Sequence, residues 1–147
     1  MVGLFDPLTD EGGDILVEVR KGGGSFREER AFYGNIVRLN TLTAKEKRVV
    51  FNRGDILQFI ADRDNVVRIG VAQHGLIRSI IHRRNVKSDW EEIYSADFRA
   101  AMEPLGFGTN PDILYVAALN GDKRALFQYD LKAKKLGRMI FAHPVYD

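Results

Sequence analysis

The sequence predicts an all-β fold made of successive antiparallel sheets. Three strand-like segments open alike, with Asp-Ile-Leu at Asp14, Asp55 and Asp112, and each is rich in β-branched or aromatic residues. Short turn sequences separate them from further strand-like segments. The best helical candidate, "SADFRAAMEPLG", has room for only a short turn before Pro104. An internal repeat is the third indication. We therefore expect a single domain over residues 1–147 with very little helix.

Length and composition are those of an ordinary folded domain. The 147 residues are 45% hydrophobic and 29% charged, and 22 basic residues nearly balance 20 acidic ones. Because the charges are so nearly balanced, the sequence does not predict nucleic acid or an anionic membrane as a partner. The absence of cysteine excludes disulfides and zinc–thiolate sites and fits a cytoplasmic protein. These residues contain neither a signal-peptide pattern nor an apolar run of about 18 residues.

Turn chemistry predicts how the strands are joined. "LNGD" (119–122) contains Asn-Gly, a strong hairpin signal, and predicts that Asn and Gly are the two central residues of the turn. "ADRDN" (61–65) and "AQHG" (72–75) bracket the strand "VVRIGV". "SADFRAAMEPLG" predicts a connection of about one helical turn, capped by Ser95 or Asp97. The Gly-rich "RKGGGSFREER" predicts a mobile hairpin tip.

The internal repeat predicts the architecture. "IVRLNTLTAKEKRVVF" (36–51) aligns without a gap on "LFQYDLKAKKLGRMIF" (126–141), 90 residues later. Asn40 and Asp130 open the two polar turns, where each side chain can accept hydrogen bonds from the backbone ahead of it. A period of about 45 residues with about four short strands is typical of β-propeller blades. We expect a partial β-propeller of about three four-stranded antiparallel blades, at residues 14–52, 53–97 and 105–147.

One long segment carries a family resemblance. "VFNRGDILQFIADRDNVVRIGVAQHGLIRSIIHRRNVKSDWEEI" combines the turn Asp62–Asn65, Arg68 in the next strand and Trp90 in an outer strand. In this it resembles blades in the N-terminal β-propeller of prolyl-oligopeptidase-type serine peptidases, nearest to dipeptidyl- and acylaminoacyl-peptidase-like members. The resemblance covers about residues 14–147, with Asn65 in place of the usual Gly. It implies a propeller that caps a hydrolase domain and gates substrate access.

No catalytic residue is carried over from that family. Its nucleophile lies in G-x-S-x-G, with Asp and His later in the chain, and no G-x-S-x-G occurs here. His74, His82 and His143 are far apart. The Asp62 turn lacks the Gly and Glu of a calcium loop, so we expect a turn stabilised by Asx hydrogen bonds there. We expect a non-catalytic chain without cofactor or metal, either a piece of a larger peptidase or a truncated reading frame. The hydrolase domain of the parent protein would be its partner.

Basic residues provide the candidate partner-binding site, Arg78, Arg83 and Arg84. Together with Lys87 they alternate with apolar residues on one hairpin. Two interpretations remain open: a solvated strand face neutralised by Asp89, Glu91 and Glu92, or a docking surface for an acidic partner or a peptide carboxylate. A separate set of charges, Arg63 and Arg68 with Asp62 and Asp64, is expected to form ion pairs that hold the turn. Six aromatic residues are expected to pack between blades: Trp90, Tyr94, Phe107, Tyr115, Phe127 and Tyr129.

Three hypotheses for function remain. The first is a non-catalytic propeller segment of a serine peptidase. The second is a stand-alone β-rich protein-interaction module that uses an exposed strand edge or the arginine hairpin. The third is a small ligand-binding barrel or sandwich. Because known propellers have about four to eight blades, three blades cannot close a ring, and we expect a homodimer through the open blade faces.

Overall fold

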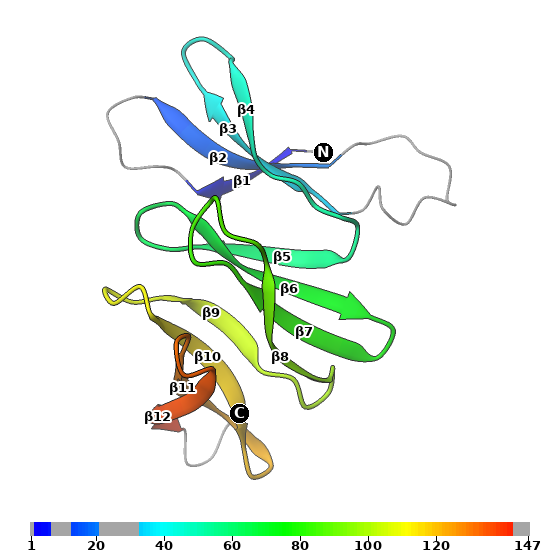
Figure 1. Ribbon diagram of the computed structural model, residues 1–147, viewed down its shortest axis with the longest axis vertical. Coiled ribbons are helices and arrows are strands. Elements are labelled where there is room, and N and C mark those ends of the chain that lie inside the picture. The colour runs from blue at the N-terminus through cyan, green and yellow to red at the C-terminus, as the bar shows by residue number, and fades with distance from the viewer. Residues whose placement is uncertain (1, 7–12, 21–32, 143–147) are drawn as a thin grey trace. The chain divides into compact units, whose positions relative to one another are not determined.

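The computed structural model describes residues 2–6, 13–20 and 33–142, and the chain divides into two compact units, Met1–Ile56 and Leu57–Asp147. Twelve β-strands in three antiparallel sheets make up the described structure, which contains no helix (Figure 1). Each sheet has four strands, and each strand pairs with its neighbours in sequence. The all-β prediction is confirmed.

The first unit contains one sheet, in the order β1 (Val2–Asp6), β2 (Asp14–Val19), β3 (Asn35–Asn40) and β4 (Glu46–Val50). It therefore begins at Val2, whereas the sequence predicted a first sheet from Asp14. Its buried apolar side chains are Leu16, Val17, Ile36, Val37 and Val50. The predicted mobile tip in residues 20–30 lies almost wholly outside the described residues.

The second unit contains the other two sheets. One has the order β5 (Ile56–Ala61, which begins at the last residue of the first unit), β6 (Val67–His74), β7 (Ile77–His82) and β8 (Glu91–Asp97). The other has the order β12 (Lys135–Ala142), β11 (Lys123–Asp130), β10 (Ile113–Asn120) and β9 (Glu103–Phe107). The three Asp-Ile-Leu segments are not equivalent, because those at Asp14 and Asp112 lead into second strands and the one at Asp55 leads into a first strand.

An apolar cluster joins the two sheets of the second unit. From the β5–β8 sheet it takes Ile69 and Ile80, and from the β9–β12 sheet and its flanks it takes Met102, Leu114, Val116, Ala118, Tyr129 and Leu131. Burial of such side chains contributes about 1.5–3 kcal/mol each. Among the six aromatic residues expected to pack between sheets, Tyr129 belongs to this cluster, and Tyr94, Phe107 and Phe127 pack against it. Trp90 instead lies beside Phe59, with 6.1 Å between ring centroids.

The repeated turn predicted from the internal alignment is present in both copies. Asn40 Oδ1 accepts hydrogen bonds from the backbone N–H groups of residues 42 and 43, at 3.2 and 2.8 Å. Asp130 Oδ1 does the same for residues 132 and 133, at 2.8 Å each. Ala44 and Lys134, also 90 residues apart, both have a left-handed backbone, with φ of 54° and 52°. The two turns thus share one conformation.

Two hairpins use a different turn from the one predicted. In β10–β11, Asn120 pairs with Lys123, so Gly121 and Asp122 are the central residues rather than Asn120 and Gly121. Gly121 has φ of +70°, which matches a type II′ turn with Gly in its first central position. The β6–β7 hairpin is alike: its turn is Gly75 and Leu76, and Gly75 has φ of +59°. A glycine early in the turn determined the register.

The predicted helical turn after Ser95 is not a helix. Strand β8 continues through Ser95 to Asp97, because Asp97 pairs with Ile77 across the sheet. Asp97 Oδ1 then accepts a hydrogen bond from the N–H of Arg99 at 3.0 Å, and its carbonyl accepts one from the N–H of Ala100. The Asp97 side chain caps an isolated turn, which is the role that Asp favours outside helices.

One of the hydrogen bonds between the two sheets of the second unit comes from a tyrosine hydroxyl, and its contribution to stability can be tested. Tyr129 Oη donates a 2.9 Å hydrogen bond to the carbonyl of Ile93 in β8. Tyr129→Phe should lower the free energy of unfolding by about 1 kcal/mol, the usual net value of one such bond, in urea denaturation. Tyr115→Phe is the matched control, since no hydrogen bond of its hydroxyl is found among the described residues. An equal loss in both variants would contradict a specific link through Tyr129.

Candidate functional site

The turn before β6 is built around Asp62. Its Oδ1 accepts hydrogen bonds from the N–H groups of Asp64 and Val66, both at 3.0 Å, and Asn65 takes the left-handed conformation with φ of 59°. Asn tolerates this conformation better than most residues. The predicted Asx turn is confirmed. It leaves the second carboxylate oxygen of Asp62 free to face the start of β6.

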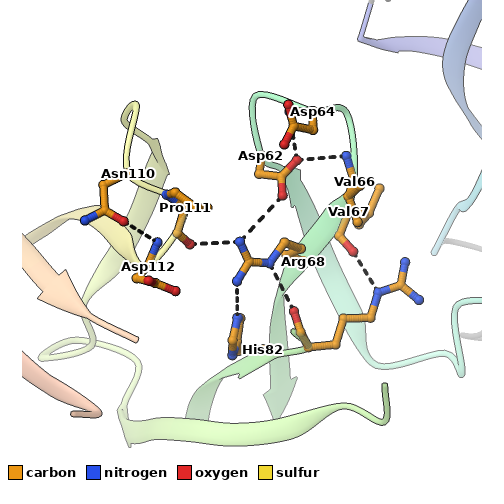
Figure 2. A network of polar contacts seen from close by, with 10 residues as sticks. Asp62, Asp64, Val66, Val67, Arg68, His82, Asn110, Pro111 and Asp112 are labelled. Carbon is orange, nitrogen blue, oxygen red and sulfur yellow. Dashed lines mark hydrogen bonds and ion pairs between the residues drawn. The ribbon is translucent and has the colours of Figure 1, made fainter. Parts of the chain in front are cut away.

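Arg68 is the centre of a polar network within the second unit (Figure 2). Its Nη1 lies 3.5 Å from Asp62 Oδ2 and donates a 2.8 Å hydrogen bond to the carbonyl of Pro111. Its Nε donates to the carbonyl of Arg83 at 3.3 Å, and its Nη2 lies 3.1 Å from His82 Nε2. One side chain therefore contacts the turn before β6, the end of β7 and the loop before β10.

The loop before β10 is shaped to meet Arg68. Asn110 Oδ1 accepts a 2.9 Å hydrogen bond from the N–H of Asp112, and the carbonyl of Asn110 accepts one from Ile113. This turn presents the Pro111 carbonyl to the guanidinium, as Figure 2 shows. The Phe107 ring lies against the same guanidinium, 5.2 Å from its centroid to Cζ.

Burial makes these partners necessary. The side chains of Arg68 and Asp62 are only 7% and 8% exposed. A buried charge is costly unless it is paired and hydrogen-bonded, and removing one partner of such a pair leaves the other uncompensated. Each of the three guanidinium nitrogens of Arg68 has a partner. The predicted ion pair between Arg68 and Asp62 is thus confirmed, whereas Arg63 is exposed and makes no ion pair with a described residue.

Contact with Arg68 determines the state of His82. A guanidinium can only donate, so Nε2 of His82 must accept and the ring proton lies on Nδ1. Burial and then the positive charge of Arg68 lower the pKa of His82 from 6.5 to about 4. His82 is therefore a neutral imidazole near pH 7.

A pocket of about 620 Å³ opens beside this network, between the ends of the two sheets of the second unit. Its lining comes from Arg68 and His82, from the β7–β8 connection, from Asp112 and from the β11–β12 turn. The other lining residues are Arg84, Ser88, Asp89, Glu91, Leu131, Lys132 and Lys134. A volume in this range suits a small molecule or one end of a peptide.

Two ion pairs lie at the pocket. Lys132 Nζ is 2.7 Å from Asp112 Oδ2, and the Lys134 ammonium donates a hydrogen bond to the Glu91 carboxylate. The hydrogen bonds from these lysines are the main cause of the lowered pKa values of Asp112 and Glu91. Both carboxylates are therefore ionised near pH 7, and each has its own cation.

The three arginines predicted to bind a partner do not form one surface. Arg83 is buried: its Nε donates a 2.7 Å hydrogen bond to the Val67 carbonyl, and its Cζ lies 4.8 Å from the Trp90 ring centroid. Burial lowers the pKa of this guanidinium. Arg78 donates to Gln73 Oε1 at 3.0 Å along the β6–β7 hairpin. Arg84 alone of the three lines the pocket.

The expected solvated basic face is therefore wrong for Arg83, whose side chain packs inward. The expected acidic partners are also different, because Glu91 pairs with Lys134 from the β11–β12 turn rather than with the arginine hairpin. Lys87 is exposed, as predicted. Alternation along a strand could not show this, since it does not reveal contacts with turns far along the chain.

Two of the three histidines lie in the described structure, at opposite ends of the β6–β7 hairpin. His74 ends β6, His82 ends β7, and His143 lies outside the described residues. Among the residues described, no group of three or more potential ligands is placed to hold a metal ion.

Sequence reasoning missed the pocket because its lining comes from four separate segments. Asp112, Lys132 and Lys134 had been considered only as strand and turn residues. The one available signal was Arg68 beside Asp62, which indicated a fixed charge at this end of the sheet. Its contact with Pro111, 43 residues later, required the fold.

Comparison with protein-family models, with curated proteins and with solved structures found no match to this chain. In the described part of the chain, no helix has the length and apolar character needed to cross a membrane.

The neutral His82 predicts a pH dependence of stability. Between its native pKa of about 4 and its ordinary value of 6.5, the unfolded chain binds the proton more strongly, so the free energy of unfolding falls as the pH is lowered. The loss should be on the order of 1–2 kcal/mol, because water screens the partly exposed ring. Urea denaturation at pH 7 and pH 4.5 should show a smaller drop for His82→Gln.

The contribution of His82 to the pH dependence must be distinguished from that of the charged groups around it. His82 is influenced by Arg68, Arg84, Glu91 and Asp112, and these groups are kept in both proteins. His74→Gln, at the other end of the β6–β7 hairpin, controls for the removal of a histidine in general. If wild type and His82→Gln lost stability in parallel on acidification, the assignment of a neutral ring with a lowered pKa would be wrong.

Proposed function

We propose that the chain is a non-catalytic β-propeller segment of a prolyl-oligopeptidase-like serine peptidase, with a role in gating substrate access. The single observation that carries this proposal is the repetition of one unit, a four-stranded antiparallel meander, three times along the chain. In the second unit, two such sheets pack through one apolar cluster. Blades of a propeller are sheets of this kind packed side by side.

The repeated turn supports the same proposal. Asn40 and Asp130 accept the same pair of backbone hydrogen bonds, and each turn joins the third and fourth strands of its sheet. In the β5–β8 sheet, the corresponding connection joins β7 and β8, where Asn85 Oδ1 accepts a 2.9 Å hydrogen bond from the N–H of Lys87. An Asx-type turn thus recurs at the equivalent place in all three sheets.

Spin-label distances test the propeller arrangement. The chain has no cysteine, so two double-cysteine proteins, Thr43→Cys with Lys87→Cys and Lys87→Cys with Ala133→Cys, would carry labels at the equivalent turns. All three residues are exposed. A propeller repeats one rotation, so the 43–87 and 87–133 distances should be similar and narrowly distributed in double electron–electron resonance.

Two results would overturn the proposal. A broad 43–87 distribution beside a narrow 87–133 one would mean that the first sheet is not a blade of the same array. Hydrolysis of aminoacyl or dipeptidyl chromogenic substrates by the purified chain, abolished by a serine-directed inhibitor, would contradict the non-catalytic role. Thr43→Cys, Lys87→Cys and Ala133→Cys proteins without label serve as the folding controls.

A second candidate function is an interaction module, for which the edge strand β12 provides a specific observation. Four of its apolar side chains are between 39% and 58% exposed: Leu136, Met139, Ile140 and Phe141. Its outer edge has no strand partner within the described structure. Exposed apolar edge strands tend to pair with other chains. We propose that a second copy of this chain covers β12, so that the protein forms a homodimer.

Sedimentation velocity tests this pairing. Wild type should form dimers at micromolar concentration, and Ile140→Lys should shift the chain to monomer, because a charge on the covered strand would be desolvated without a partner. Leu42→Lys is the control, because Leu42 is 84% exposed and lies in the turn between β3 and β4 rather than in β12. A monomeric wild type, or equal dissociation of both variants, would contradict the dimer.

A further inference from the structure

The charges around the pocket of the second unit do not all have partners. Three of its four cationic side chains are paired: Arg68 with Asp62, Lys132 with Asp112 and Lys134 with Glu91. The fourth, Arg84, forms no ion pair or hydrogen bond with any described residue. Its guanidinium is exposed at the pocket. An arginine with five free donors is suited to bind an oxyanion.

The charge of Arg84 affects three other residues that line the pocket. After the larger causes given above, it contributes to the lowered pKa values of His82, Glu91 and Asp112. These three residues come from β7, β8 and the loop before β10. The guanidinium therefore acts electrostatically on these three side chains.

His82 supplies a second donor. Its Nε2 accepts from Arg68, so Nδ1 carries the proton, and no described residue accepts from that N–H. The ring also lines the pocket. Arg84 and His82 thus both line this pocket, and each carries a donor, one charged and one neutral.

We propose that this pocket binds a carboxylate, held by the Arg84 guanidinium and the Nδ1–H of His82. This site goes beyond the proposed propeller role and does not depend on it. A planar carboxylate with two oxygens matches the fork of a guanidinium.

Phosphate fits this pocket less well. Asp89, Glu91 and Asp112 also line the pocket, and a second negative charge on the ligand would be repelled by them. The lysines that could attract phosphate are already paired with Asp112 and Glu91. The carboxylate could belong to a small organic acid or to the C-terminus of a peptide, and both fit the volume.

Benzoate is the first probe, with the neutral benzamide as its isostere. Chemical shifts of backbone and arginine side-chain N–H groups should move saturably with benzoate around the pocket and not with benzamide. Arg84→Gln should weaken benzoate binding about tenfold, as expected for loss of a charged hydrogen bond. Arg99→Gln, which removes an exposed arginine outside the pocket, should bind as wild type does.

Peptides then distinguish the source of the carboxylate. Two peptides of identical sequence, one with a free and one with an amidated C-terminus, are titrated in the same way. Binding of benzoate and of the free peptide supports a general carboxylate site, and binding of the free peptide alone supports a peptide terminus. Binding of benzoate alone supports a small organic acid.

Several outcomes would overturn the proposal. If neither benzoate nor the free peptide saturates a site, the pocket does not bind a carboxylate. If Arg84→Gln and Arg99→Gln weakened benzoate binding equally, the binding would be explained by general charge attraction rather than by a site at Arg84. Inorganic phosphate binding more tightly than benzoate would assign the site to a different ligand. Circular dichroism of each variant confirms that the fold is kept.

Discussion

The second unit depends on one buried cation. Arg68 lies in β6, yet its guanidinium holds the turn before that strand, the end of β7 and the carbonyl of Pro111 before β10. Apolar packing between the sheets is not directional, whereas hydrogen bonds fix distance and angle. Arg68 therefore defines how the two sheets meet at this end. Burial, and then the charge of Arg68, keep His82 neutral.

The pocket follows from this arrangement as well. Arg68 draws the loop before β10 toward the end of β7, and the turns at Asp112 and Lys132 come with it. Charged residues from separate segments then meet at the ends of the sheets, where turns rather than strands contribute the side chains. Turn residues tolerate change better than the strands that carry them, so such a place is suited to binding.

Local chemistry in the sequence predicted much of the fold. The polar turns at Asn40 and Asp130 and the Asx turn at Asp62 are present because their hydrogen bonds lie within a few residues. The turn at Gly121 was placed one residue off, since both Asn-Gly and Gly-Asp are acceptable turns and the strand register decides between them. The site was less predictable. Burial of Arg83 and pairing of Lys134 with Glu91 depend on contacts between distant segments.

Connectivity in all three sheets is the simplest that strands allow: each strand lies beside the one before it. Such a chain has low contact order. Each meander can therefore form one hairpin after another, with little loss of loop-closure entropy at each step. The joining of the second and third sheets is different, because it buries the Arg68 guanidinium, whose one backbone partner from the other sheet is the Pro111 carbonyl. We therefore expect docking of these two sheets, rather than strand pairing, to limit how fast the second unit folds.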